Sequence, residues 1–280
     1  MNARLPGVDQ PQLAVRFAAV GGGRTYVAHQ RATHPFHVGR ALYRSADPAG
    51  HCTLFSQGCS GGLFEGDRVS ASLVAGAGTR ALVTTAAATI VHRMPRGGHA
   101  EQRVRIVAEP GALFEYVPEP AILFPASRLR SQLCLQLGPG ARVVVIESVL
   151  QHGLPDDSEP FAWLESELTI EDPVGRLIAR ERSSVQGSLW RSSAPGLGGE
   201  YTCQGNVFVL GAGEAPLAPL RTLLDTLPGI YGGATLLPGR AGVLARVLAV
   251  DGVALRAALS ACHSRARLAF GLPAPGPRPK

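Results

Sequence analysis

The segment Gly58–Gly62 (GCSGG) has the pattern of the turn that presents a nucleophilic serine in many hydrolases. In that turn the serine stands between a strand and a helix, which exposes its hydroxyl to a histidine base. Ser60 occupies the nucleophile position, and aspartates and His263 follow it in the order of a catalytic triad. The next residues, Leu63–Arg68, contain Gly66 and lead into a strand pattern instead of a helix. A Ser60-dependent hydrolase is therefore the less favoured alternative.

Imidazole and thiol side chains are the next candidates for chemistry, because they bind transition metals. The close groupings are His34 with His37, His51 with Cys52 and Cys59, and His92 with His99. None has the C-x-x-C or H-x-x-x-H spacing that closes a tetrahedral site. The sequence predicts no tightly bound cofactor, while a weak, transient nickel-type site that uses one imidazole stays open.

Four carboxylates lie within or beside apolar segments: Asp67, Glu115, Glu119 and Glu147. A carboxylate that faces a protein interior must be paired or hydrated, because burial of an unpaired charge is costly. One interpretation is that these residues line a polar channel or contact a partner. The other, which is favoured from the residues alone, is that they form ion pairs with Arg68, Arg80 or Arg128.

The basic residues exclude several function classes. Lys280 is the only lysine of the chain, so an internal Walker lysine, a Schiff-base lysine and a lysine general base are excluded. The net charge of +6 comes from arginines spread along the chain. They form no basic run with interleaved aromatic residues, which disfavours nucleic-acid binding and suits an acidic protein partner.

Neither a secretion signal nor a membrane span is predicted. Met1–Val20 contains charged residues and no apolar core. The best apolar run, Val143–Ile146, is far shorter than the ~20 residues that a membrane helix needs. The 5 cysteines are odd in number and scattered, which does not suit a disulfide framework. We therefore expect a cytoplasmic protein.

Short apolar segments punctuated by Gly and Pro dominate the first two-thirds of the chain and predict strands. These segments are Leu13–Phe17, Val69–Leu73, Ala81–Val91, Val104–Val107, Leu113–Val117, Leu133–Leu137, Val143–Val149, Leu164–Ile170 and Leu177–Arg182. Three of the joints between them are alike, with Gly78, Gly111 and Gly140 at the third place of a tight turn. A period of about thirty residues is typical of β-solenoid coils. We predict a mainly β protein with a layered, β-helix-like (solenoid-type) architecture; three hairpins in a sandwich are the alternative.

Two helices are expected, both in the C-terminal third. The first covers Leu217–Leu227 and ends at Pro228-Gly229. The second begins at Asp251 as a cap, and its apolar stripe includes Leu255, Leu259 and Cys262. That stripe either forms an exposed partner-binding surface or packs on the β core. Residues 1–272 are expected to form a single domain, followed by a flexible Pro-rich tail at 273–280.

Four blocks of sequence occur in an order and spacing that resemble a known family. They are Gly61–Arg68 (GGLFEGDR), Ala81–Thr89 (ALVTTAAAT), Tyr116–Phe124 (YVPEPAILF) and Gly242–Ala249 (GVLARVLA). Together they resemble the UreD family of urease accessory proteins, called UreH in some organisms. The resemblance extends from Leu13 to Phe270.

The resemblance implies a β-helical fold with two helices and a chaperone without a catalytic site. Family members bind UreF and, through it, the GTPase UreG; the assembly docks on apo-urease and assists nickel insertion into its metallocentre. A dimer of such heterocomplexes is left open. Because nickel is proposed to pass through an internal channel in this family, Asp67, His92, Glu119 and Glu147 become the candidates for a transient nickel path.

The chain departs from the family pattern at several positions. The family usually has Gln where this sequence has Ala86 and Lys where it has Ile90, and His92 stands near the place of an aromatic residue. Pro120 and Ala121 replace two polar residues. We therefore expect a divergent member, in which the residue roles of the strand before Ile90 are open. A stand-alone β-solenoid module that binds glycans or anions is the remaining alternative.

Overall fold

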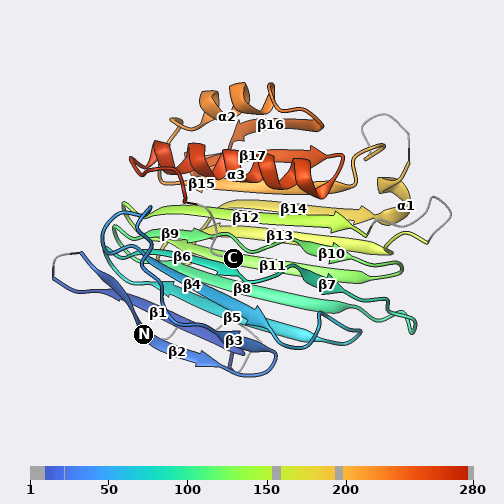
Figure 1. The fold of residues 1–280 in the computed structure, drawn as a ribbon, viewed down its shortest axis with the longest axis horizontal. Coiled ribbons are helices and arrows are strands. Elements are labelled where there is room, and N and C mark those ends of the chain that lie inside the picture. Colours follow the sequence, from blue (N-terminus) through green and yellow to red (C-terminus); the bar gives the residue numbers. More distant parts are fainter. Residues whose placement is uncertain (1–9, 22, 153–158, 193–197, 277–280) are drawn as a thin grey trace.

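The computed structural model describes residues 10–21, 23–152, 159–192 and 198–276. Most of the regular structure is β, and the strands form a β-solenoid of about 3 turns. Within these ranges the strands build two sheets, and three α-helices occur in the later part of the chain (Figure 1). The prediction of a layered, solenoid-type β fold is confirmed.

Seven strands make up the first sheet, sheet A. They are β1 (Leu13–Ala19), β2 (Thr25–Ala32), β5 (Arg68–Ala75), β8 (Ala100–Ala108), β11 (Arg128–Leu137), β13 (Trp163–Glu171) and β14 (Leu177–Gln186). Their order across the sheet is β14-β13-β11-β8-β5-β1-β2.

The remaining strands belong to sheet B. They are β3 (Phe36–Val38), β4 (Cys52–Gly58), β6 (Arg80–Thr85), β7 (Thr89–Val91), β9 (Leu113–Tyr116), β10 (Ala121–Leu123), β12 (Arg142–Gln151), β15 (Cys203–Leu210), β16 (Ile230–Leu236) and β17 (Gly242–Ala249). The order is β16-β17-β15-β12-β9-β6-β4-β3; the short strand β10 pairs with β12, and β7 pairs with β10.

Each coil of the solenoid passes from sheet A to sheet B. Strands β5, β8, β11 and β13 stack in parallel in sheet A, and β4, β6, β9 and β12 do so in sheet B. The turns from the first sheet to the second contain Gly78, Gly111 and Gly140, whose φ angles are 65°, 69° and 66°. Only glycine adopts this left-handed conformation without strain. Because the turns join different sheets, the hairpin alternative is wrong.

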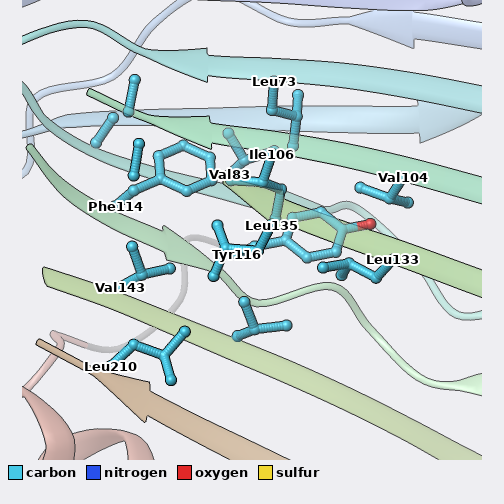
Figure 2. Close-up of a cluster of buried hydrophobic side chains, with 14 of the residues drawn as sticks. Leu73, Val83, Val104, Ile106, Phe114, Tyr116, Leu133, Leu135, Val143 and Leu210 are labelled. Carbon is cyan, nitrogen blue, oxygen red and sulfur yellow. The ribbon is translucent and has the colours of Figure 1, made fainter. Parts of the chain in front are cut away.

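The apolar core lies between the two sheets. Alternate residues of each strand point inward, so Leu73, Ile106, Leu135 and Ile170 lie side by side in register on sheet A. They are buried together with residues of sheet B such as Phe114 (Figure 2). Full burial of an aliphatic side chain contributes about 1.5–3 kcal/mol, and the stacked coils repeat this contribution at every level.

Helices cover the outer face of sheet B in its C-terminal part. Strands β15, β17 and β16 extend the sheet from β12 with antiparallel pairing. The helices α2 (Leu217–Leu224) and α3 (Gly252–Ala269) lie over these strands (Figure 1), and α1 (Gly187–Trp190) is a single turn. Asp251 caps α3, since its carboxylate accepts the N–H of Ala254 at 2.8 Å.

Both predicted helices are present, although α2 ends at Leu224 and not at Leu227. The sequence did not predict β2, β3, β4, β10, β15, β16 or β17, and the predicted strand Ala81–Val91 is two strands, β6 and β7. Residues 273–276 of the predicted tail form no regular structure, and residues 277–280 lie outside the described part of the chain.

Candidate functional site

A cavity of about 560 Å³ lies between the two sheets. It adjoins the apolar core on the side away from the three Gly turns, since Leu73, Val83, Val104, Tyr116 and Leu133 form part of its wall. The rest of the wall is rich in polar side chains from both sheets: Ser56, Thr85, Gln102, Ser131, Ser166, Glu119, Glu147, Gln204 and Asn206. A polar interior wall is unusual in a β core and requires water or a ligand to satisfy it.

The polar wall is a consequence of strand register. On sheet A, Gln102, Ser131, Ser166 and Ser183 lie directly beside one another on β8, β11, β13 and β14. The hydroxyls of Ser166 and Ser183 are 2.7 Å apart. On sheet B, Glu147 of β12 pairs with Asn206 of β15. The stacking of coils therefore turns one polar position per strand into a continuous polar row.

Glu147 is the carboxyl group of this cavity wall whose pKa is strongly shifted. Burial, and secondly the charge of Glu181, raise the pKa of Glu147 to about 7. Its register partner Asn206 is 9% exposed, and its Oδ1 has no hydrogen-bond partner among the described residues. A carboxyl group that exchanges its proton near neutral pH, beside an unpaired carbonyl oxygen, offers oxygen ligands to a divalent cation.

The four residues predicted for the nickel path occupy two places. Glu119 and Glu147 both lie on the cavity wall, and Glu119 also faces Arg256 of α3 at 3.8 Å. Asp67 and His92 are not among the residues that line the cavity. Their role in nickel transfer stays a prediction.

Asp67 and His92 instead hold a turn that borders the cavity. The Asp67 carboxylate accepts the N–H of Phe64 at 2.8 Å. His92 Nε2 lies 3.1 Å from the carbonyl oxygen of Gly61, and its ring stacks on Phe64 with centroids 4.3 Å apart. Both residues therefore fix the conformation of Gly61–Phe64, and Gly62 and Leu63 of this segment line the cavity.

Ser60 lacks the surroundings of an activated nucleophile. Its hydroxyl donates to the carbonyl oxygen of Gly62 at 2.7 Å. The chain continues from Ser60 through a turn into β5, so no helix follows as the nucleophile turn requires. His263, the histidine in triad order, lies on α3 and bonds to Glu115. The geometry gives no support to the hydrolase alternative.

A second polar cluster, which sequence reasoning missed as a unit, is buried beneath α3. Glu115 of β9 is fully buried, and its Oε1 lies 3.0 Å from His51 Nε2. His263 of α3 hydrogen-bonds the other carboxylate oxygen. Arg267 of the same helix lies 3.6 Å from Glu115 and donates to Asp47 at 2.8 Å. Only the i, i+4 spacing of His263 and Arg267 on one helix face hinted at this arrangement.

The cluster keeps Glu115 ionised. Burial alone raises the pKa of a carboxyl group, but hydrogen bonds from His263 and His51 and the charge of Arg267 outweigh it and hold the pKa of Glu115 well below its usual range. The interpretation of Glu115 as an ion-paired residue is therefore correct, but the expected partners Arg68, Arg80 and Arg128 are wrong: the partners come from α3 and from the segment before β4. These contacts join α3 to the sheet.

The apolar stripe Leu255, Leu259 and Cys262 does not form an exposed surface. These side chains are 1%, 8% and 0% exposed and belong to the core between α3 and sheet B. Gly205 of β15 permits the close approach, because a Cβ at this position would lie 2.7 Å from Leu259 Cδ2. The expectation of a partner-binding stripe is corrected: the helix uses it to cover the sheet.

Comparison with known proteins gives the family of this chain. The family model described as UreD urease accessory protein matches residues 9–280. The chain belongs to the UreD family. It is 38% identical over 272 residues to urease accessory protein UreD 1 of Pseudomonas syringae pv. syringae, with 92% of this chain and 93% of the relative covered.

More distant relatives carry the same description. Urease accessory protein UreD 1 of Methylorubrum extorquens is 37% identical, with 93% of this chain and 88% of the relative covered. Urease accessory protein UreD of Haloarcula marismortui is 34% identical, with coverages of 97% and 90%. Membership of the UreD family supports a role in urease maturation. Within the described residues, no helix has the length and apolar character needed to cross a membrane.

Proposed function

We propose that this chain is a cytoplasmic chaperone of urease maturation that joins UreF, and through it the GTPase UreG, to apo-urease. In this proposal it also passes nickel toward the urease metallocentre through the cavity between its two sheets. The observation that carries the proposal is the polar wall of that cavity, with Glu147 beside the unpaired Oδ1 of Asn206.

The chemistry of the wall suits a cation that passes through and does not stay. In the described ranges, no three His, Cys, Asp or Glu side chains are arranged so that they could hold a metal ion together, so a cation in the cavity meets few protein ligands at once and keeps part of its water shell. Glu147 exchanges its proton near neutral pH, so it takes up a cation and releases it again on reprotonation. The single lysine of the chain, Lys280, agrees with a division of labour in which a partner hydrolyses the nucleotide.

Glu119 and Glu147 are the wall residues that we propose to contact nickel. Asp67 and His92 remain candidates for its approach, because both hold the Gly61–Phe64 segment at the border of the cavity. This arrangement retains all four residues of the predicted path and separates them into a wall pair and a border pair.

The test has two arms. Co-expression with a tagged UreF should retain this chain in a pull-down. In cells that lack the endogenous gene, Glu147→Ala should lower urease activation in a complementation assay, whereas the exposed control Glu200→Ala should activate like the wild type. Equal activation by both variants would remove Glu147 from the path, and the absence of UreF from the pull-down would remove the scaffold role.

A further inference from the structure

The polar rows of the cavity do not stop at its wall. Beyond Asn206 the row of sheet B continues to Arg246 of β17, its register partner. Arg246 stands two residues from the core residue Leu244 on the same strand, so its side chain points toward sheet A. In sheet A, Glu181 lies two residues before Ser183 on β14, so its side chain points to the same face as that of Ser183, toward sheet B. Each sheet therefore places a charged side chain just past the cavity.

These two side chains form an ion pair that bridges the sheets. Arg246 Nη2 donates to Glu181 Oε1, and the two side chains are 49% and 25% exposed. This ion pair between described residues joins β14 of sheet A to β17 of sheet B. Arg246 lies beside Asn206 of the cavity wall, and the charge of Glu181 acts on Glu147.

The other end of the cavity reaches the surface without such a closure. Its wall there includes Cys59, Ala86 and Ala87, which are exposed. A passage needs an entrance and an exit, and the cavity as it stands has exposed wall residues at the Cys59 end and an ion pair beyond the Glu147 end. The pair contains one guanidinium, which repels a divalent cation, and one carboxylate, which attracts it once the guanidinium has moved.

We propose that the Glu181–Arg246 ion pair is a latch that closes the second end of the cavity and opens to release the cation that Glu147 has bound. This inference rests on the proposed function, because it assumes that a divalent cation enters the cavity. Opening exposes Glu181 as a further oxygen ligand, so the cation moves from Glu147 toward the surface between β14 and β17. The latch thus sets the direction of transfer.

The experiment plugs the first end and measures exit through the second. Cys59 is exposed and lines the cavity, Cys52, Cys203 and Cys262 are buried, and the intermediate Cys134 is changed to Ser in all variants. A bulky maleimide on Cys59 then obstructs the first end. The full chain is loaded with Ni²⁺ alone, and transfer of the ion to a chromogenic chelator is followed by stopped flow.

The labelled wild type should release Ni²⁺ more slowly than the unlabelled protein. Labelled Arg246→Gln should release it about fivefold faster than the labelled wild type, which corresponds to about 1 kcal/mol for a pair of this exposure. The charge exchange Glu181→Arg with Arg246→Glu restores a pair and should return the slow rate. The difference in bound Ni²⁺ between the wild type and Glu147→Gln shows how much of the ion is bound in the cavity.

Three results would overturn the latch: equal rates for labelled wild type and labelled Arg246→Gln, no slowing of the wild type by the label, or Ni²⁺ binding that does not depend on Glu147. A melting curve confirms that each variant is folded. If a single variant does not fold, the charge-exchange variant is compared with the wild type in its place. Failure of the proposed function is distinguishable from these results. It would show as normal urease activation by Glu147→Ala in the complementation assay, whereas failure of the latch would show in the Ni²⁺ release rates of the purified chain.

Discussion

Replacement of Arg267 by methionine should destabilise the protein far more than the same change two residues earlier. Arg267 is fully buried, and its guanidinium faces the equally buried carboxylates of Asp47 and Glu115. Arg267→Met leaves these carboxylates with only His51 and His263 as partners. Burial then acts against their ionised forms without the opposing guanidinium.

The size of the effect follows from burial. Removal of one partner of a buried ion pair costs about 3–5 kcal/mol, because the other charge stays in a medium of low polarity. For a domain of this size, 1 kcal/mol lowers the Tm by about 2–4 °C, so a decrease of roughly 6–20 °C is expected. Methionine and arginine have similar helix propensities, so the helix itself contributes little to the difference.

The assay is thermal unfolding of the full chain at neutral pH, followed by circular dichroism. Arg265→Met is the matched control, because Arg265 lies on the same helix and is exposed; its Tm should stay close to the wild type. The double variant Asp47→Asn with Arg267→Met should recover part of the loss, because one stranded carboxylate is then neutral. Equal Tm values for Arg267→Met and Arg265→Met would refute the reasoning that the cluster fastens α3 to the sheet.

Three further predictions concern pH and packing. Because the folded-state pKa of Glu115 is lowered, its stabilising contribution is complete above the unfolded pKa of ~4.3 and is lost as the pH falls through the folded value. The stability advantage of the wild type over Glu115→Gln in urea unfolding should therefore shrink below about pH 4.3, and a constant difference would contradict the cluster geometry. The raised pKa of Glu147, about 7, predicts by contrast that Ni²⁺ affinity measured by calorimetry increases between about pH 6 and about pH 8; Glu147→Gln should remove that increase. Finally, Leu259→Ala should lower the unfolding free energy of the isolated chain by about 2–5 kcal/mol, whereas Val253→Ala, at an 80% exposed position of the same helix, should leave it nearly unchanged; equal effects would revive a partner-binding role for the stripe.

Local sequence signals were sufficient for the repeating part of the fold. Gly78, Gly111 and Gly140 mark the turns because each adopts a positive φ, a requirement that is local and visible in residue type. The Asp251 cap and the stripe of α3 are equally local, so this helix was predicted with its N-terminus. The strand β2 was not predicted because its polarity alternates only weakly and half of its residues are exposed. Its pairing with β1, and not its own pattern, makes it a strand.

The sequence by itself determined the solenoid, both helices and the presence of four carboxylates beside apolar strands. It did not determine which of these carboxylates share a site, because that depends on which strands become neighbours and in what register. Stacking of the coils brings Glu147 against Asn206 across β12 and β15. It places Glu115 on the opposite face of sheet B, where it meets His263 of α3, 148 positions later in the chain. When an acidic residue stands between apolar residues on either face of a strand, the sequence pattern does not show which face points into the cavity. Only the tertiary structure decides that one acid lines a polar cavity and the other is sealed in a buried ion-pair network.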